Sequence, residues 1–128
     1  MKILIIGSGG REYAIAVAIK KSGAALFAAL GNGGIAEIAT CLDIQATDID
    51  GVKQAVKEHN IDFVVVAPDE PLALGMVDEL EAISVRAFGA NKSAARIESS
   101  KVWSKNFMQR HSIPTAWFKV FCKQKYPQ

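Results

Sequence analysis

The chain has 128 residues, of which 50% are apolar and 22% charged, and its formal net charge is +2 at pH 7. This length and composition are typical of one compact globular domain. The small net charge does not favour a nucleic acid or an anionic membrane as a partner, and no apolar run approaches the ~20 residues that span a bilayer.

The chain begins with the pattern of a strand, a glycine-rich turn and a helix. The apolar run at residues 3–6 is followed by Gly7-Ser8-Gly9-Gly10, and a helix is expected over residues 11–21. Backbone N–H groups in such a loop can approach an anion, and the dipole of the following helix adds partial positive charge. Arg11 can donate paired hydrogen bonds to an anionic oxygen. The pattern predicts a small-anion site, with phosphate as the preferred ligand, and a tight turn without a ligand is the alternative.

The same glycines disfavour a dinucleotide. The G-x-G-x-x-G fingerprint would have its third glycine at the position of Glu12. It would also have a carboxylate after the second strand, expected over residues 25–30, but that strand is followed by Gly31-Asn32-Gly33-Gly34. On both counts the sequence disfavours NAD and FAD.

The remaining chain alternates strands and helices. Residues 63–66, Phe-Val-Val-Val, form an apolar run without alternation, as is typical of a buried parallel strand. The expected elements are strands at residues 41–44, 61–67 and 85–88, and helices from Asp48 or Asp50 to His59 and at residues 71–82, 92–97 and 99–110. This order predicts an α/β fold: a Rossmann-like parallel sheet of about five strands, flanked by helices.

Ligands of such sheets bind outside the carboxyl ends of the strands. This rule brings three loops together. The loop at residues 7–12 offers backbone donors and a cation, the loop at residues 31–34 offers flexible amides, and the loop at residues 68–71 offers carboxylates. The candidate substrate-binding residues are Gly7, Gly9, Gly10, Arg11, Glu12, Asn32, Asp69 and Glu70.

Structural roles stay open for three of these candidates. Asn32 is also typical of a left-handed turn. Asp69 and Glu70 are also suited to capping a helix ahead of Pro71.

Several sequence blocks together point to a known family. They are G-S-G-G-R-E at the start, G-N-G-G after the second strand, P-D-E-P-L after the fourth, F-G-A-N-K-S-A-A-R-I-E-S-S-K-V-W-S-K-N-F-M at residues 88–108, and I-P-T-A at residues 113–116. These blocks cover most of residues 1–118 and resemble the N-terminal domain of phosphoribosylamine–glycine ligase (glycinamide ribonucleotide synthetase).

The resemblance implies an ATP-dependent carbon–nitrogen ligase that joins phosphoribosylamine to glycine in purine biosynthesis, with a pre-ATP-grasp α/β domain first. It names the expected anion as the 5-phosphate of phosphoribosylamine. ATP and magnesium are the implied cofactors of the full-length enzyme, and Lys101 matches a lysine that tends to face the nucleotide phosphates. For Lys101 and Lys105, solvated helix positions are the alternative. A free-standing phosphate-sugar binding module and an NAD(P)-binding oxidoreductase domain are the other candidate functions.

The chain also departs from the pattern of the family. The differences are Tyr13 for His, Leu30 for Pro, Ala67 for Gly, Asp69 for Glu, Ala90 for Pro and Ser99 for Gly. Asp69 keeps the carboxylate but shortens its reach by one methylene group.

The resemblance also suggests how the chain is divided. We expect a substrate-binding domain at residues 1–98, a linker helix at residues 99–118 leading toward an ATP-grasp domain, and a divergent tail at residues 119–128. Family members are several times longer, and no Asp or Glu follows Glu98. We therefore expect a truncated chain that is inactive alone and binds no cofactor by itself. An ATP-grasp domain in trans, or a second copy docked through the last helix, are the expected protein partners.

No catalytic residue and no metal site are predicted from the motifs. The two cysteines, Cys41 and Cys122, form no C-x-x-C motif, and Met1-Lys2 leads straight into a strand without the regions of a secretory signal. Free thiols in such a chain fit a reducing compartment, so we expect a cytoplasmic protein.

Overall fold

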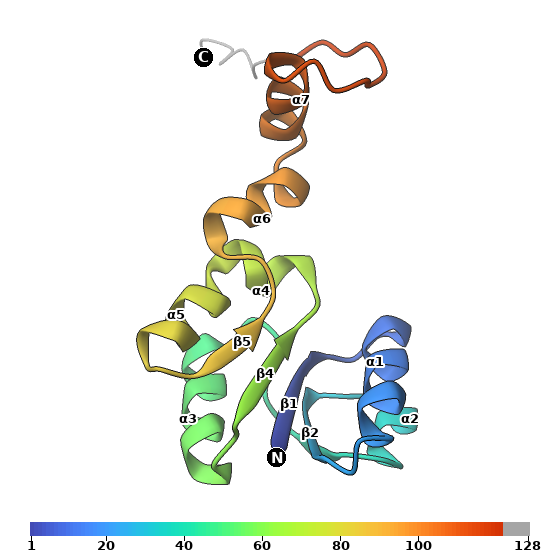
Figure 1. The fold of residues 1–128 in the computed structure, drawn as a ribbon, viewed down its shortest axis with the longest axis vertical. Coiled ribbons are helices and arrows are strands. Elements are labelled where there is room, and N and C mark those ends of the chain that lie inside the picture. Colours follow the sequence, from blue (N-terminus) through green and yellow to red (C-terminus); the bar gives the residue numbers. More distant parts are fainter. Residues whose placement is uncertain (122–128) are drawn as a thin grey trace, which may run out of the picture.

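In the computed structural model, which describes residues 1–121, five parallel strands form one sheet with helices on both faces (Figure 1). The strands are β1 (Lys2–Gly7), β2 (Ala25–Leu30), β3 (Thr40–Leu42), β4 (Phe63–Val66) and β5 (Arg86–Phe88). The helices are α1 (Gly10–Lys20), α2 (Gly33–Ala36), α3 (Ile49–His59), α4 (Asp69–Leu74), α5 (Met76–Ala82), α6 (Lys92–Ser99) and α7 (Lys101–Arg110). The predicted fold class is confirmed.

The strand order is β3-β2-β1-β4-β5, so the direction of the chain across the sheet reverses once. The chain runs from β1 outward to β3, then returns to the other side of β1 to form β4 and β5. The carboxyl ends of β1 and β4 therefore flank the reversal, which is where open α/β sheets hold their ligands.

Unbroken apolar runs in the inner strands supply the core on both faces of the sheet. Because successive strand residues face opposite sides, Leu4 and Ile6 of β1 pack on one face, toward α3 and α5, and Ile5 on the other, toward α1. Leu4, Ile5 and Ile6 are fully buried. Each such side chain contributes about 1.5–3 kcal/mol of burial free energy, which explains why a run without alternation is stable here.

Two expected elements differ in detail. The helix expected over residues 71–82 is two helices, because Gly75 takes a φ of 99°, and its left-handed backbone ends α4. The loop expected at residues 31–34 instead leads into the short helix α2. The other strands and helices lie within a few residues of their expected bounds.

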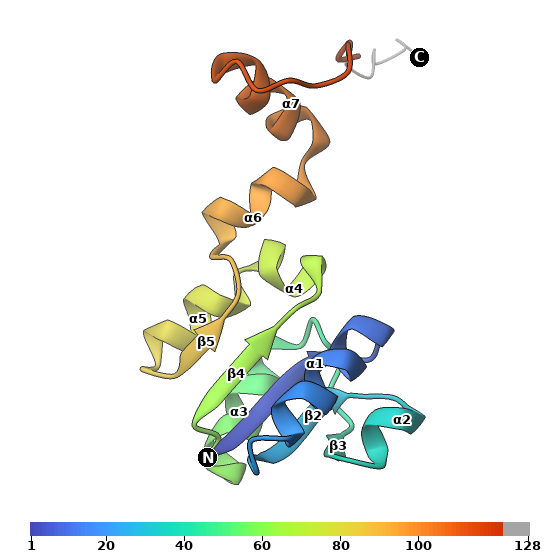
Figure 2. The ribbon, with the colours of Figure 1, turned by 45° about the vertical axis from the view of Figure 1, so that its right-hand side comes forward.

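Residues 92–121, here called the arm, rise away from the sheet in both views (Figures 1 and 2). On α7, the rings of Trp103 and Phe107 are stacked, with centroids 5.2 Å apart. Most of the predicted divergent tail, residues 122–128, lies outside the described residues. Among the helices described, none combines the length and apolar character needed to cross a membrane.

Candidate functional site

Three loops meet at the carboxyl ends of β1, β2 and β4. Asn32, from the loop after β2, donates from Nδ2 to the carbonyl oxygen of Ser8 in the loop after β1, at 2.7 Å. Arg11 places Nη1 3.8 Å from Oδ1 of Asp69, which follows β4. The structure thus brings together the three segments that the sequence predicts at one site.

The first loop is shaped by Gly7 and leaves open space at Gly10. Gly7 has a φ of 114°, and a Cβ there would lie 2.8 Å from Cγ of Pro68. A Cβ at Gly10, by contrast, would meet nothing within 4 Å. The N–H groups of Gly10 and Arg11 lie in the first turn of α1 and have no carbonyl four residues earlier in the helix to bond. They are free to face an anion at the positive end of the helix dipole.

Glu12 folds back onto this loop. Its Oε2 accepts a hydrogen bond of 2.7 Å from the N–H of Gly9, which is half of a capping box. Its Oε1 accepts one of 3.0 Å from Nε of Arg11. Sequence reasoning placed Glu12 in the site but missed this role, although the three-residue spacing from Gly9 is that of a capping box.

Arg11 presents a permanent positive charge at the mouth of the loop. Its side chain is 57% exposed. The hydrogen bond to Glu12 is the main cause that raises the pKa of Arg11 above its ordinary value, and the nearby carboxylate of Asp69 adds to it. The guanidinium therefore stays charged at every pH at which the protein would be studied.

Asn32 caps α2, which corrects one alternative reading of this residue. Its Oδ1 accepts a hydrogen bond of 2.9 Å from the N–H of Ile35, and its own φ is −147°, so it is not a left-handed turn residue. Leu30, two residues before Asn32, has a φ of 70°. A proline ring locks φ near −65°, so the departure at Leu30 from the expected Pro-Gly-Asn pattern coincides with a backbone that proline cannot adopt.

The two carboxylates after β4 lie in the first turn of α4. Pro68 occupies the N-cap position, so neither Asp69 nor Glu70 is the capping residue that sequence reasoning allowed as an alternative. Both side chains are exposed, and both benefit from the positive end of the helix dipole. Their oxygens are available to hydroxyl or amine groups.

The lysines of the arm lie apart from these loops. Lys101 is exposed at the start of α7. Helix α7 lies far from α1 in both views (Figures 1 and 2). Lys105 donates to Oγ1 of Thr115 and, at 3.4 Å, to the carbonyl oxygen of Ala116. The structure does not bring Lys101 to the three-loop site.

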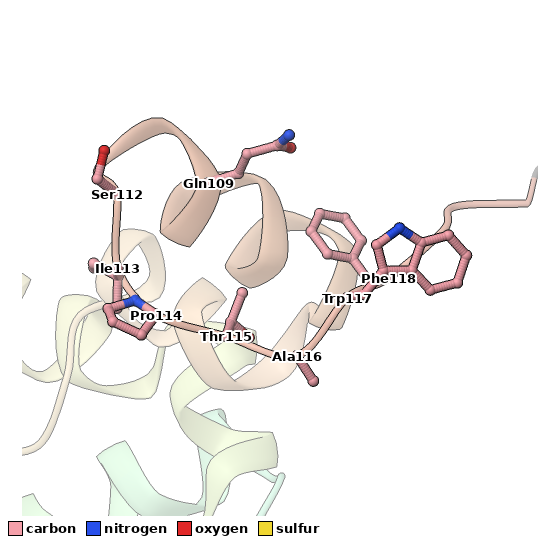
Figure 3. Close-up of a pocket in the computed structure, with 8 residues that line it drawn as sticks. All are labelled: Gln109, Ser112, Ile113, Pro114, Thr115, Ala116, Trp117 and Phe118. Carbon is pink, nitrogen blue, oxygen red and sulfur yellow. The ribbon is translucent and has the colours of Figure 1, made fainter.

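An open hollow of about 490 Å³ lies in the arm, between α7 and the chain that follows it. Figure 3 shows residues 112–118 running back alongside the helix. Trp117, at its edge, is 87% exposed, and no carboxylate lines the hollow. Within residues 1–121, no group of three or more His, Cys, Asp or Glu residues is arranged to hold a metal ion.

Comparisons with known proteins agree with the fold and with the family resemblance of the sequence. Residues 1–98 match the family model described as phosphoribosylglycinamide synthetase, N domain. Over 123 residues the chain is 40% identical to the phosphoribosylamine–glycine ligase of Caldanaerobacter subterraneus, covering 94% of this chain and 30% of that protein. It is 45% identical to the ligase of the same name from Agrobacterium fabrum, covering 94% and 29%.

Solved structures show the same relationship. The phosphoribosylamine–glycine ligase of Thermotoga maritima superposes with a TM-score of 0.69 at 31% identity, covering 93% of this chain and 27% of that one. The biotin carboxylase domain of a thermophilic 2-oxoglutarate carboxylase shares the fold, with a TM-score of 0.71 at 15% identity over 89% of this chain and 28% of that one. The chain spans about three tenths of the length of the ligases that it matches.

Proposed function

Because the chain belongs to the phosphoribosylglycinamide synthetase N-domain family, we propose that it forms the part of a phosphoribosylamine–glycine ligase that binds phosphoribosylamine, in purine biosynthesis. The observation that carries this proposal is the linkage of three loops at the strand reversal, with Arg11 between the glycine loop and Asp69.

The 5-phosphate binds at the start of α1. The N–H groups of Gly10 and Arg11 donate to its oxygens, and the guanidinium of Arg11 adds charge-assisted hydrogen bonds. Gly7 and Gly9 shape the loop that lets the backbone approach the phosphate.

The other end of the substrate faces α4. Asp69 and Glu70 accept hydrogen bonds from the hydroxyl or amine groups of the sugar, because an ionised carboxylate offers only acceptors. The site has the cation of Arg11 at one end and the carboxylates of Asp69 and Glu70 at the other. A ligand with an anionic group at one end and hydrogen-bond donors at the other matches this arrangement.

The residues of this chain do not fit a magnesium-nucleotide site. Magnesium prefers oxygen ligands and is usually held by carboxylates together with phosphates. No Asp or Glu follows Glu98, and the part of the chain that the structure describes contains no cluster suited to a metal. Lys101 alone remains a candidate for contact with nucleotide phosphates. A polypeptide of these 128 residues therefore makes no glycinamide ribonucleotide unless an ATP-grasp domain is supplied.

A ligand panel tests the binding proposal. Ribose 5-phosphate should raise the melting temperature of the chain, because a ligand that binds only the folded state stabilises it, and ribose should not. Stabilisation by NAD(P) without any by ribose 5-phosphate would instead support the oxidoreductase alternative.

A turnover assay tests the ligase proposal. With ATP, magnesium, glycine and phosphoribosylamine, the chain alone should release no ADP above background. Adding a separately produced ATP-grasp region of a family ligase should restore glycine-dependent release, which a free-standing sugar-phosphate module would not support. Turnover by the chain alone would contradict its proposed dependence on a second domain.

A further inference from the structure

Glu12 is the buried charged group of the site, and its carboxylate faces only the protein. Its side chain is 5% exposed. Among residues 1–121, the only other polar side chain in the same burial class is Ser104. Burying a carboxylate is costly unless its oxygens are hydrogen-bonded, and here each oxygen has one partner, the N–H of Gly9 and Nε of Arg11.

We propose that Glu12 is a positioning residue: it does not touch the substrate, but aims the guanidinium of Arg11 at the phosphate and holds the glycine loop closed. This inference rests on the proposed function, because it assigns a role within the proposed phosphate site. It changes the expectation for Glu12, which the sequence places among the residues that contact the ligand.

The geometry of Arg11 supports this role. Nε of Arg11 donates to Oε1 of Glu12 at 3.0 Å, and this bond orients the guanidinium from the side facing the protein. The one other carboxylate within ion-pair range in the described chain is that of Asp69, 3.8 Å from Nη1 and thus beyond hydrogen-bond length. The outer edge of Arg11 is left to donate two parallel N–H hydrogen bonds to an anionic ligand.

The shape of the loop supports the same role. A Cβ at Gly9 would lie 2.6 Å from Oε2 of Glu12, and one at Gly7 would lie 3.0 Å from its Cγ. The side chain of Glu12 therefore fills the space that the two missing side chains leave. The loop and the carboxylate fit each other as one unit, and at 5% exposure the side chain of Glu12 offers the substrate almost no surface.

The replacement Glu12→Gln distinguishes positioning from electrostatics, because the two explanations predict opposite changes in the affinity for ribose 5-phosphate. It removes a negative charge beside the phosphate site, so electrostatics alone would make ribose 5-phosphate bind more tightly. A glutamine has only one acceptor oxygen, so either the bond from Gly9 or the bond from Arg11 is lost. We expect roughly tenfold weaker binding by calorimetry, the effect of losing one hydrogen bond that involves a charged group. Glu81→Gln, at an exposed acid of α5, should leave the affinity unchanged.

A second measurement needs no ligand. In the ¹H–¹⁵N spectrum at neutral pH, the Nε–H group of Arg11 should give its own sharp signal, because a hydrogen-bonded proton exchanges slowly with water. The signal should broaden or vanish in Glu12→Ala, which removes both acceptor oxygens, and persist in Glu81→Gln.

Each outcome decides between the alternatives. Affinity equal to or tighter than wild type in Glu12→Gln, or an unaltered Arg11 signal in Glu12→Ala, overturns the positioning role. If wild type does not bind ribose 5-phosphate, the proposed function fails, and the Arg11 signal alone decides whether Glu12 holds Arg11. If Glu12→Gln does not fold, Glu12→Asp keeps the charge but withdraws the carboxylate by one methylene group. It should also bind more weakly, and equal affinity would contradict the proposal.

Discussion

The side-chain amide of Asn32 donates a hydrogen bond of 2.7 Å from Nδ2 to the carbonyl oxygen of Ser8, across 24 positions of the sequence. The same side chain accepts a hydrogen bond from the N–H of Ile35 through Oδ1. One residue therefore links the glycine loop after β1 to the first turn of α2, and both functional atoms of its amide are engaged within the protein.

Replacing Asn32 should destabilise the fold as well as the site. Asn32→Ala removes the cap of α2 and the link to Ser8, and should lower the free energy of unfolding by about 1–2 kcal/mol, as measured in urea. Asn32→Asp keeps an acceptor for Ile35 but sets a carboxylate oxygen against the carbonyl of Ser8, so its stability should be intermediate. An aspartate variant as stable as wild type would show that the link to Ser8 contributes nothing.

Two glycines of the first loop should respond oppositely to alanine. Gly7→Ala should destabilise the protein by about 1–3 kcal/mol, because its φ of 114° and the close approach of Pro68 leave no room for a Cβ. Gly10→Ala should be neutral or stabilise α1 by up to about 1 kcal/mol, since a Cβ there meets nothing.

Gly10→Ala should nevertheless weaken the binding of ribose 5-phosphate, because the new methyl group occupies the space that the phosphate would enter. Unfolding in urea and calorimetry on the same samples check both effects. Unchanged affinity in Gly10→Ala would place the phosphate elsewhere.

The ion pair between α3 and α5 should give a pH-dependent contribution to stability. Nζ of Lys53 donates to Oε2 of Glu79 at 2.8 Å, and this bond is the main cause that raises the pKa of Lys53 above its ordinary value. A raised lysine pKa means that the contribution is present below the unfolded-state pKa and is lost as the pH rises through the folded-state pKa.

The difference in melting temperature between wild type and Lys53→Met should therefore be small and positive at pH 7, and should shrink in alkaline buffer or at high salt. A difference that is constant from neutral to alkaline pH would assign the effect to packing of the lysine stem instead.

The arm should promote self-association. Val102 is 49% exposed, and its neighbours Trp103, Phe107 and Met108 on α7 are only half-buried. Exposed apolar patches usually find a partner, so light scattering should show association that increases with protein concentration. Val102→Lys should reduce it without removing the stacked rings of Trp103 and Phe107. A wild-type chain that stays monomeric at high concentration would contradict association through this helix.

Local sequence patterns were sufficient to predict the fold and the meeting of the three loops. They were insufficient to predict contacts in which a side chain or segment turns back onto the chain. The unbroken apolar runs of β1 and β4 predicted inner parallel strands because only burial on both faces makes such runs stable. The division of the expected helix at Gly75 was missed, because an isolated glycine in a helical pattern can either break the helix or be tolerated within it.

The candidate site shows the same limit. The three loops were predicted to meet because carboxyl ends of parallel strands share an edge. The inward turn of Glu12 was not predicted, because a carboxylate two residues after the glycine-rich turn Gly7–Gly10 fits a ligand contact as well as a bond to the loop itself. The contacts of Lys105 with Thr115 and Ala116 depend on the reversal after α7, where Ser112 takes a φ of 54°, and no local pattern marks that residue as left-handed.

The central claim is that the loop after β1 holds the phosphate of the substrate through Arg11, and calorimetric titration with ribose 5-phosphate tests it most directly. Wild type should bind, and Arg11→Ala should lose about 1.5–3 kcal/mol of binding free energy, the range for a hydrogen bond that involves a charged group. Lys21→Ala removes an equal charge just past the other end of α1 and should bind like wild type. Equal affinity in wild type and Arg11→Ala would contradict the account.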